Sequence, residues 1–160
     1  MLHKISILTA CVLAVLLLNL TACKKSNNGP SIFGTWNYDS RSGNYIYRMS
    51  YKFYGDSTLL FTNTVLDTTR KELGYRYKMT GRYRFNGSAL SLFQSNVWSL
   101  QNAPNVLYAS EQNLIPLLTI AAEQKLTVNF SADKTSFVLI YPPCGPSENC
   151  LGSSGPYIKQ

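Results

Sequence analysis

Cys23 is the residue whose chemistry the sequence predicts most directly. It ends the tetrapeptide Leu20-Thr21-Ala22-Cys23, which follows Lys4 and the largely apolar run 5–20. A positive start, an apolar run and a small-residue site form a cleaved export signal, and the cysteine of this lipobox pattern takes a diacylglycerol on its thiol. We therefore predict that residues 1–22 are a lipoprotein signal peptide and that Cys23 becomes the acylated N-terminus. An uncleaved membrane helix is the alternative, but the run is shorter than the roughly 20 residues that span a bilayer.

Residues 23–31 are polar and contain the Gly29-Pro30 pair, which is typical of a flexible tether. Two or three acyl chains, each gaining about 0.8 kcal/mol per buried CH2 group, would hold the protein on a membrane. Lys24 stands where an aspartate would resemble an inner-membrane retention signal, and no acidic run like that of surface lipoproteins follows it. We therefore expect a cell-envelope protein, lipid-anchored at the outer membrane and facing the periplasm.

Cys144 and Cys150 are the cysteines that remain in the mature chain once Cys23 is acylated, and five residues of a turn-rich segment separate them. Because the envelope is oxidising, we predict a disulfide between them. Closing this short loop would stabilise the fold by about 2–3 kcal/mol, and would pin residues 144–160 as a C-terminal tail. A metal site is the alternative, but two thiolates need further ligands and the only histidine, His3, leaves with the signal.

Catalytic arrangements are scarce in the mature chain. Without a histidine, the Ser-His-Asp and Cys-His arrangements are unavailable. We find no Gly-rich phosphate loop and no calcium-loop motif. Asp56 and Asp133 lie at predicted turns, where aspartate bonds the local backbone. We therefore expect no enzyme activity and no cofactor, although two carboxylates brought together by folding, as in glycosidases, stay open.

The charge balance suits an anionic partner. The sequence has a net charge of +7 at pH 7, and the loss of Lys4 leaves +6 on the mature chain. Anionic lipid or polysaccharide of the envelope would match this charge. Nucleic acid would match it equally, but we expect no nucleic-acid partner for an exported protein. The residues after the signal are enough for one domain.

Residues 43–54 alternate between an apolar face and a mostly polar one, which predicts a half-buried strand. The apolar face carries Tyr45, Tyr47, Met49, Tyr51 and Phe53. Gly55-Asp56 then predicts a turn, and the β-rich run 58–65 predicts the second strand of a hairpin.

The clearest alternation covers residues 75–85. Its aromatic face carries Tyr75, Tyr77, Met79, Gly81, Tyr83 and Phe85, and its other face carries Arg76, Lys78, Thr80, Arg82 and Arg84. Asn86-Gly87 is the pair favoured in a two-residue hairpin turn. That turn would place Phe85 opposite Ser88 and Tyr83 opposite Leu90, so apolar residues would face apolar residues. Gly81 would mark a bulge or bend.

The rest of the chain predicts further short strands. Residues 97–100 and 106–108 are short candidates, and 125–130 with 136–141 predict a hairpin. Residues 114–123 fit either a short helix capped by Asn113 or a strand. Seven or eight short antiparallel strands predict an all-β sandwich or barrel, with one short helix near 113–123 as an option.

Three segments together resemble the lipocalin-like lipoproteins of Gram-negative bacteria: Ile32-Phe33-Gly34-Thr35-Trp36, the stretch 51–57, and the stretch 81–92. The resemblance implies a single antiparallel lipocalin-like barrel over residues 32–143. Gly34-Thr35-Trp36 is similar to the opening motif of lipocalins, so the resemblance implies that Trp36 closes the barrel base. The chain departs from lipocalins in having no Thr-Asp-Tyr loop and no arginine after residue 141 to stack on Trp36.

Two faces are candidate binding sites. The aromatic faces could line a site for a small apolar ligand, or they could simply fill the core. The ligand-site candidates are Tyr45, Tyr47, Tyr51, Phe53, Tyr75, Tyr77 and Tyr83. The basic face, Arg76, Lys78, Arg82 and Arg84, could contact an anionic envelope component, or it could only keep the strand soluble. We therefore expect non-catalytic binding or carriage of a small apolar ligand, with an envelope interaction module as the alternative.

Overall fold

The computed structural model describes residues 31–100, 106–118, 123–143 and 153–160. Cys23, Cys144 and Cys150 lie outside these residues, so their predicted acylation and disulfide stay predictions. The strands are β1 (Gly34–Ser42), β2 (Tyr45–Phe53), β3 (Thr58–Leu66), β4 (Glu72–Asn86), β5 (Ala89–Ser99), β6 (Ile115–Leu117), β7 (Glu123–Phe130), β8 (Ser136–Ile140) and β9 (Ser153–Lys159). A single 3-10 turn, η1 (Glu111–Asn113), is the helical element in the described part.

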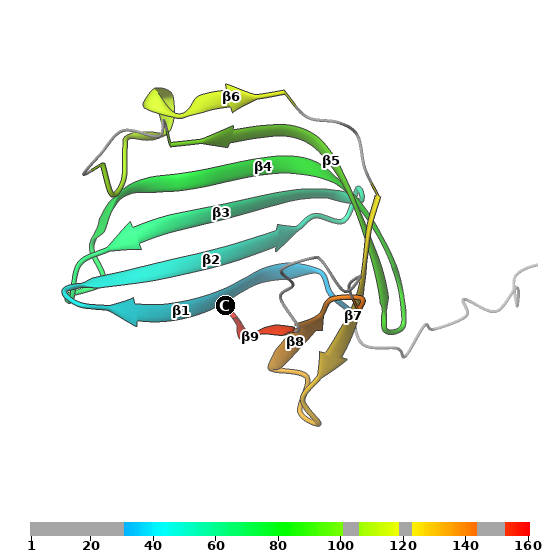
Figure 1. Ribbon diagram of the computed structural model, residues 1–160. Helices are drawn as coiled ribbons and strands as arrows, with labels where there is room; N and C mark the ends of the chain where they lie inside the picture. The colour runs from blue at the N-terminus through cyan, green and yellow to red at the C-terminus, as the bar shows by residue number, and fades with distance from the viewer. Residues whose placement is uncertain (1–30, 101–105, 119–122, 144–152) are drawn as a thin grey trace, which may run out of the picture.

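The strands form one antiparallel sheet that closes on itself. Its order is β4-β3-β2-β1-β9-β8-β7-β5, and β4 also pairs with β5, so eight strands form a ring. β6 continues along the β5 edge beyond β7. The predicted all-β barrel is therefore confirmed, and Figure 1 shows β1 to β5 as the long wall of this barrel.

The ring is complete only at one end. β9 pairs with Trp36 and Asn37 of β1, and β7 pairs with residues 89–93 of β5. In the described residues, no strand pairs with Tyr38–Ser42 on the side of β9. In Figure 1 the short strands β7, β8 and β9 accordingly close the right-hand end, and the long strands extend past them to the left.

The core lies at the closed end. Trp36 is completely buried and its ring centroid lies 4.7 Å from that of Phe137, which comes from β8. Phe53, Leu92 and Leu139 are equally inaccessible. Burying such a side chain stabilises the fold by about 1.5–3 kcal/mol, so this end carries most of the packing energy.

A bulge in β5 lies opposite Gly81. The pairing shifts between Thr80 and Gly81, whose partners are Asn96 and Gln94. A Cβ on Gly81 would lie 2.2 Å from the carbonyl oxygen of Phe93, so only glycine allows this close approach of the two backbones. The predicted irregularity at Gly81 is therefore confirmed. It occurs where β5 stops pairing with β7 and starts to pair with β6.

The β4–β5 hairpin forms, but its predicted register is wrong by two residues. Phe85 pairs with Leu90 and Tyr83 pairs with Leu92, because Gly87-Ser88 form the turn instead of Asn86-Gly87. Gly87 has a φ of 67°, and glycine is the residue that type II′ turns take at their first central position. A shift of two residues keeps every side chain on its face, so Tyr77, Met79, Tyr83 and Phe85 stay on the predicted aromatic face. Tyr75 does not, because a bulge at Arg76 pairs Tyr75 with Thr64, which lies opposite the outward-facing Arg48.

Three other expectations need correction. Residues 115–117 form β6 and Leu114 is extended, so the optional helix near 113–123 is absent from its described part. Residues 106–108 are not a strand; Ala109 makes an isolated bridge to Tyr75 instead. The expected tail 144–160 is not a tail throughout, since its last described residues form β9.

Three turns share an Asp-x-Thr arrangement. The carboxylates of Asp56, Asp67 and Asp133 each accept hydrogen bonds from the backbone N–H and the hydroxyl of the threonine two residues later. Hydrogen bonds from Ser131 and Thr135 lower the pKa of Asp133 to about 2. Asp56 and Asp133 therefore accept local hydrogen bonds in turns, as the sequence predicted.

Candidate functional site

Two neighbouring rows of inward-facing residues cross the long wall of the barrel. Strand register places the closed row side by side: Trp36, Tyr51, Phe61, Met79 and Val97. The next inward positions on the same strands form the open row: Tyr38, Met49, Asn63, Tyr77 and Ser99.

The rows differ in their contact with solvent. In the closed row every residue except the half-buried Phe61 is at most 6% exposed. Every residue of the open row is half-buried. The open row lies at the end of the wall where, in the described residues, Tyr38–Ser42 have no partner strand on the side of β9. The open row is therefore the more exposed of the two inner rows.

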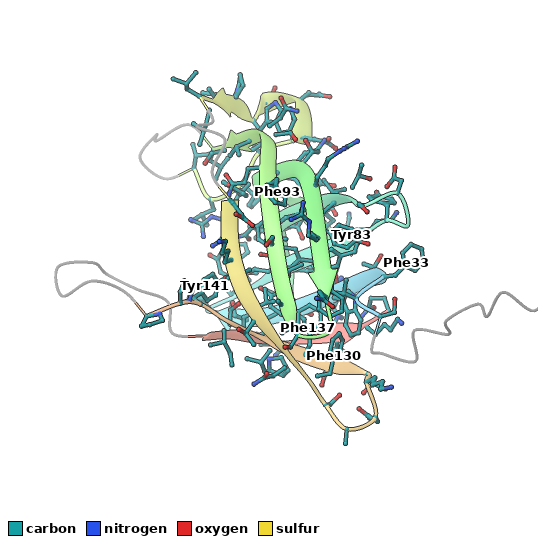
Figure 2. The ribbon with its side chains drawn as sticks, turned by 90° about the vertical axis from the view of Figure 1, so that its right-hand side faces the viewer. Phe33, Tyr83, Phe93, Phe130, Phe137 and Tyr141 are labelled. Atoms are coloured by element: carbon teal, nitrogen blue, oxygen red, sulfur yellow. The ribbon has the colours of Figure 1, made fainter. Side chains whose placement is uncertain are left out.

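A chain of hydroxyl groups from β9 and from Tyr141, which follows β8, borders the open row. The Tyr141 and Ser154 hydroxyls lie 3.4 Å apart, and the Ser154 and Tyr157 hydroxyls lie 3.3 Å apart. The Tyr157 hydroxyl in turn donates to the sulfur of Met49 at 3.9 Å. The Tyr38 and Tyr157 rings lie 5.8 Å apart. Figure 2 shows Tyr141 on the segment that follows β8. The interior at this end is thus aromatic and hydroxyl-rich.

Tyr51, Tyr77 and Tyr157 stay neutral at ordinary pH. Burial raises the pKa of Tyr157 to about 12, and burial with the neighbouring tyrosine hydroxyls raises the pKa of Tyr51 well above 10. Burial also raises the pKa of Tyr77. Neutral phenols both donate and accept hydrogen bonds, so the site can pair with polar groups of either kind but offers no charge.

Asn63 occupies the middle of the open row. It pairs with Met49 on β2 and with Tyr77 on β4, so its side chain enters the barrel between them. Its Oδ1 atom is buried and has no hydrogen-bond partner in the described protein. Buried acceptors in folded proteins normally have a donor, so this atom marks a position where a donor would be stabilising.

The structure divides the predicted ligand-site residues into three groups. Tyr51, Phe53 and Tyr83 belong to the packed end: the Phe53 and Tyr83 rings lie 4.9 Å apart, and the Tyr83 hydroxyl donates to the Tyr54 carbonyl at 2.8 Å. Tyr77 is the one member that lies in the open row. The sequence therefore predicted the right face of the sheet but not which part of it is accessible.

The third group lies toward the far edge of the sheet. The Tyr45 ring contacts that of Tyr108 at 6.5 Å, and the Arg76 guanidinium lies 5.3 Å from the Tyr47 ring. Tyr75 bonds to Ala109 through both backbone groups, and burial followed by the nearby Glu72 carboxylate raises its pKa to about 12. These three tyrosines are half-buried and engaged with their own neighbours.

Trp36 lies under a cation from the last strand. The indole Nε1 donates to the Ile32 carbonyl at 2.7 Å, and the Lys159 ammonium lies 5.3 Å from the ring centroid. The sequence contains no arginine after residue 141. Lys159 of β9 supplies a cation there. A cation over tryptophan contributes about 0.5–1 kcal/mol at an exposed site.

The basic face is not uniform. Lys78 pairs with Glu111 and lies 5.3 Å from the Trp98 ring. Arg76 covers Tyr47, as described above. Arg82 and Arg84 are exposed, and Arg84 lies 5.8 Å from the ring of Phe93, which Figure 2 shows on the β5 wall. Of the four predicted residues, Arg82 and Arg84 are the ones placed for an external anion.

The outer side of the open end is held by ion pairs. Asp39 lies opposite Arg48 in the β1–β2 register and accepts two hydrogen bonds from its guanidinium, at 2.8 and 2.9 Å. Arg70, from the turn before β4, also contacts the Asp39 carboxylate. The hydrogen bond from Arg48 lowers the pKa of Asp39. Charge pairs thus support the wall outside the open row.

Sequence reasoning missed Tyr38, Asn63, Tyr141, Ser154 and Tyr157. Asn63 is a polar residue at an inward position, so it reads as an interruption of the β3 pattern. Tyr157 belongs to β9, whose serines, glycine and proline are not typical of a strand. Aromatic residues at 36 and 38 alternate with polar residues at 37 and 39, and this pattern could have predicted that Tyr38 faces inward beside Trp36.

Comparison with known proteins finds no family model, no curated protein and no solved structure that matches this chain. In the described residues, no three His, Cys, Asp or Glu side chains gather where a metal ion could bind. Those residues also contain no helix with the length and apolar character to cross a bilayer.

Proposed function

We propose that this protein is a lipid-anchored envelope lipoprotein whose lipocalin-like barrel binds or carries a small apolar ligand without catalysis. The observation that carries the proposal is the open row, in which the inward-facing Tyr38, Met49 and Tyr77 lie with two polar residues and are all half-buried. Small-molecule sites in barrels are typically apolar with a few convergent polar groups, and the row with its hydroxyl chain has this composition.

The anchoring part of the proposal rests on the sequence. The lipobox ending at Cys23 supports acylation and export, and the Lys24 position supports the outer membrane with the barrel facing the periplasm. The mass of the N-terminal peptide tests it: a diacylglyceryl group on Cys23 supports the anchor, whereas an intact residue 1–30 segment contradicts it. A Cys144–Cys150 disulfide would show in the same spectra as a mass change on reduction.

The exposed arginines support a secondary contact. Arg82 and Arg84 have no carboxylate ion-pair partner in the described residues and project outward from β4. We include an anionic envelope component as a partner for them, since opposite charges attract at short range even in salt. Ligand binding inside the barrel does not depend on this contact.

A second candidate function is an envelope interaction module. One observation favours it: among the described residues, five of the eight exposed large apolar side chains lie in residues 106–118, namely Val106, Leu107, Ile115, Leu117 and Leu118. Leu118 is 98% exposed. Grouped apolar exposure of this kind is typical of contact surfaces for other macromolecules.

Native mass spectrometry of the full chain, purified from its own envelope, separates the two functions. A co-purifying small-molecule mass that disappears on denaturation supports the carrier. A bare protein mass under the same gentle conditions, together with a second protein species in the spectrum, supports the interaction module. The denatured sample is the control for covalent modification.

A further inference from the structure

The outer surface of the closed end combines aromatic rings with exposed arginines. Tyr54 donates its backbone N–H to the Thr58 carbonyl across the β2–β3 turn, at 2.9 Å. Arg82 pairs with Thr58 on one side and with Phe93 on the other. Figure 2 looks onto this end of the molecule and shows Phe33 and Phe93 on it.

Phe33 and Arg84 extend this surface. Phe33 is 53% exposed, and a Cβ on Gly55 would lie 3.5 Å from its ring, so the ring lies against the β2–β3 turn. Arg84 is exposed and lies 5.8 Å from the Phe93 ring. We call this set of side chains the closed rim: Phe33, Tyr54, Arg82, Arg84 and Phe93.

The closed rim has an excess of positive charge. Its two arginines have no carboxylate within ion-pair distance in the described residues. The exposed Lys52 adds a third cation, 5.0 Å from the Tyr54 ring. The carboxylate of this turn is that of Asp56, and on β7 Glu123 and Lys125 offset each other. Three cations therefore face one carboxylate, which favours contact with an anionic surface.

The closed rim is also the part of the barrel nearest along the chain to the proposed anchor. Ser31 is the first described residue and comes two positions before Phe33. Eight residue steps separate Ser31 from Cys23, and at full extension they span at most about 30 Å. An acylated Cys23 would therefore hold the closed rim close to the bilayer and raise the effective concentration of lipid around it.

The residue types of the closed rim fit a lipid headgroup layer. Aromatic rings are enriched at the level of the headgroups, and a guanidinium binds phosphate oxygens with two parallel hydrogen bonds. The exposed apolar segment 106–118 has a different character, because its only charged residue is Glu111. That segment therefore lacks the cations that an anionic lipid surface attracts.

We infer that the closed rim docks on the anionic phospholipid surface of the anchoring membrane. This inference rests on the acyl anchor of the proposed function. The long strands run from the closed end to the open end (Figure 1), so docking at the first directs the open row away from the bilayer. A ligand of the open row would then exchange with the aqueous space and not directly with the lipid.

The test uses tryptophan fluorescence in the acylated full chain, inserted by its anchor into vesicles whose lipids carry brominated acyl chains. Bromine quenches an indole ring that lies in the lipid layer. Phe33→Trp places an added indole on the closed rim, and Leu118→Trp places one on the segment 106–118, where Leu118 is 98% exposed. Both changes lie on the surface, and the wild-type signal of Trp36 and Trp98 is subtracted.

We expect the added indole of Phe33→Trp to be quenched in vesicles of equal parts phosphatidylglycerol and phosphatidylcholine, and to be quenched less in phosphatidylcholine alone. We expect no quenching in Leu118→Trp. The quenching should also decrease between 0.1 M and 1 M salt, where the Debye length falls from about 10 Å to about 3 Å.

Charge variants separate docking from simple nearness to the anchor. Adding Arg82→Gln and Arg84→Gln to Phe33→Trp should weaken docking by about fivefold for each charge removed. Adding Arg41→Gln and Lys71→Gln is the matched control, because it removes the same charge from exposed positions toward the other end of the strands. We expect the control to keep the quenching.

Three results would overturn the inference: equal quenching in both charge variants, quenching of Leu118→Trp without Phe33→Trp, and no quenching of either indole. The mass of the N-terminal peptide is measured on the same samples. An acylated chain with any of these results loses the docking surface and keeps its anchor. A chain without the acyl group loses the anchor and, with it, the docking surface.

Discussion

The closed row and the open row lie on the same five strands, one inward position apart, yet they have different roles. Side chains of the short strands pack against the closed row, as Phe137 does against Trp36. Behind the open row the ring of described strands is incomplete, and Tyr157 contacts Tyr38 and Met49. The difference teaches that ring closure, more than residue type, decides whether a tyrosine packs or is available: Tyr51 is buried and Tyr77 is half-buried.

The largest expected effect is on stability at the closed end. Trp36→Ala removes the contacts of the indole ring with Phe137 and Phe130. This change should lower the free energy of unfolding by about 3–5 kcal/mol. Tyr38→Ala, one inward position further along β1, should cost only about 1 kcal/mol because its side chain is half-exposed. Denaturant unfolding measures both. Equal losses for the two variants would remove the distinction between the rows.

Alkaline titration probes Tyr157, which joins the two ends. Below pH 10 tyrosine is neutral in both folded and unfolded chains. Between pH 10 and the folded pKa of about 12, only the unfolded chain releases the proton, so stability should fall as pH rises through this window. The loss should reach about 2–3 kcal/mol for two pH units.

Tyr157→Phe should reduce the fall in the free energy of unfolding between pH 10 and pH 12. Unfolding experiments from pH 9 to pH 12 measure this. The variant keeps the ring stacked on Phe137 and removes only the hydroxyl that ends at Met49. An unchanged alkaline profile in Tyr157→Phe would show that this hydroxyl is accessible and that β9 does not seal the barrel.

The ion pairs outside the open end give an acid prediction. Asp39 has a lowered pKa, so its contribution is present above the unfolded value of about 4 and is lost as pH falls below it. Asp39→Asn should cost about 1 kcal/mol at pH 7, since solvent screens these partly exposed groups, and should weaken the acid dependence below pH 4.

Glu123→Gln is the control for that acid prediction, because its pair with Lys125 is longer, at 3.7 Å, and exposed. We expect its unfolding free energy to match that of the wild type at pH 7. If both variants lose the same stability, the Asp39–Arg48 pair does not stabilise the open end more than an exposed ion pair does.

The smallest effect is expected at Lys159. Lys159→Met keeps the aliphatic stem over Trp36 and removes the charge, which should cost about 0.5–1 kcal/mol. Lys125→Met, an exposed change on β7, should cost less. A thermal melt in low and high salt measures both variants; a wild-type melting temperature for Lys159→Met would mean that the cation does not stabilise the closed end.

Much of the long wall could be predicted from the sequence. The alternation in β2 and β4 fixes which side chains face inward, because a period of two maps directly onto the two faces of a sheet. The hairpin register could not be fixed, since Asn86-Gly87 and Gly87-Ser88 both suit a two-residue turn. The two turns are one residue apart, which changes the strand register by two residues and preserves the faces, so the pattern itself does not distinguish them.

The closure of the ring could not be predicted in the same way. β9 has the sequence Ser153-Ser154-Gly155-Pro156-Tyr157-Ile158-Lys159, whose glycine, proline and serines are typical of a loop. It is a strand because β1 and β8 both offer it free edges, which is tertiary information. Without β9, the positions of Tyr157 and Lys159, and so the boundary between the two rows, stay hidden.

The most direct test of the two-ended barrel is methyl NMR of the full chain labelled at its methionine methyl groups and titrated with β-naphthol. Met49 lies in the open row and Met79 lies in the closed row, where it is 4% exposed. The full chain also contains Met1, so Met49→Leu and Met79→Leu together assign the two resonances. The account predicts a saturable shift of the Met49 methyl and an unmoved Met79 methyl. A shift of Met79 without Met49, or saturable binding that moves neither, would contradict it.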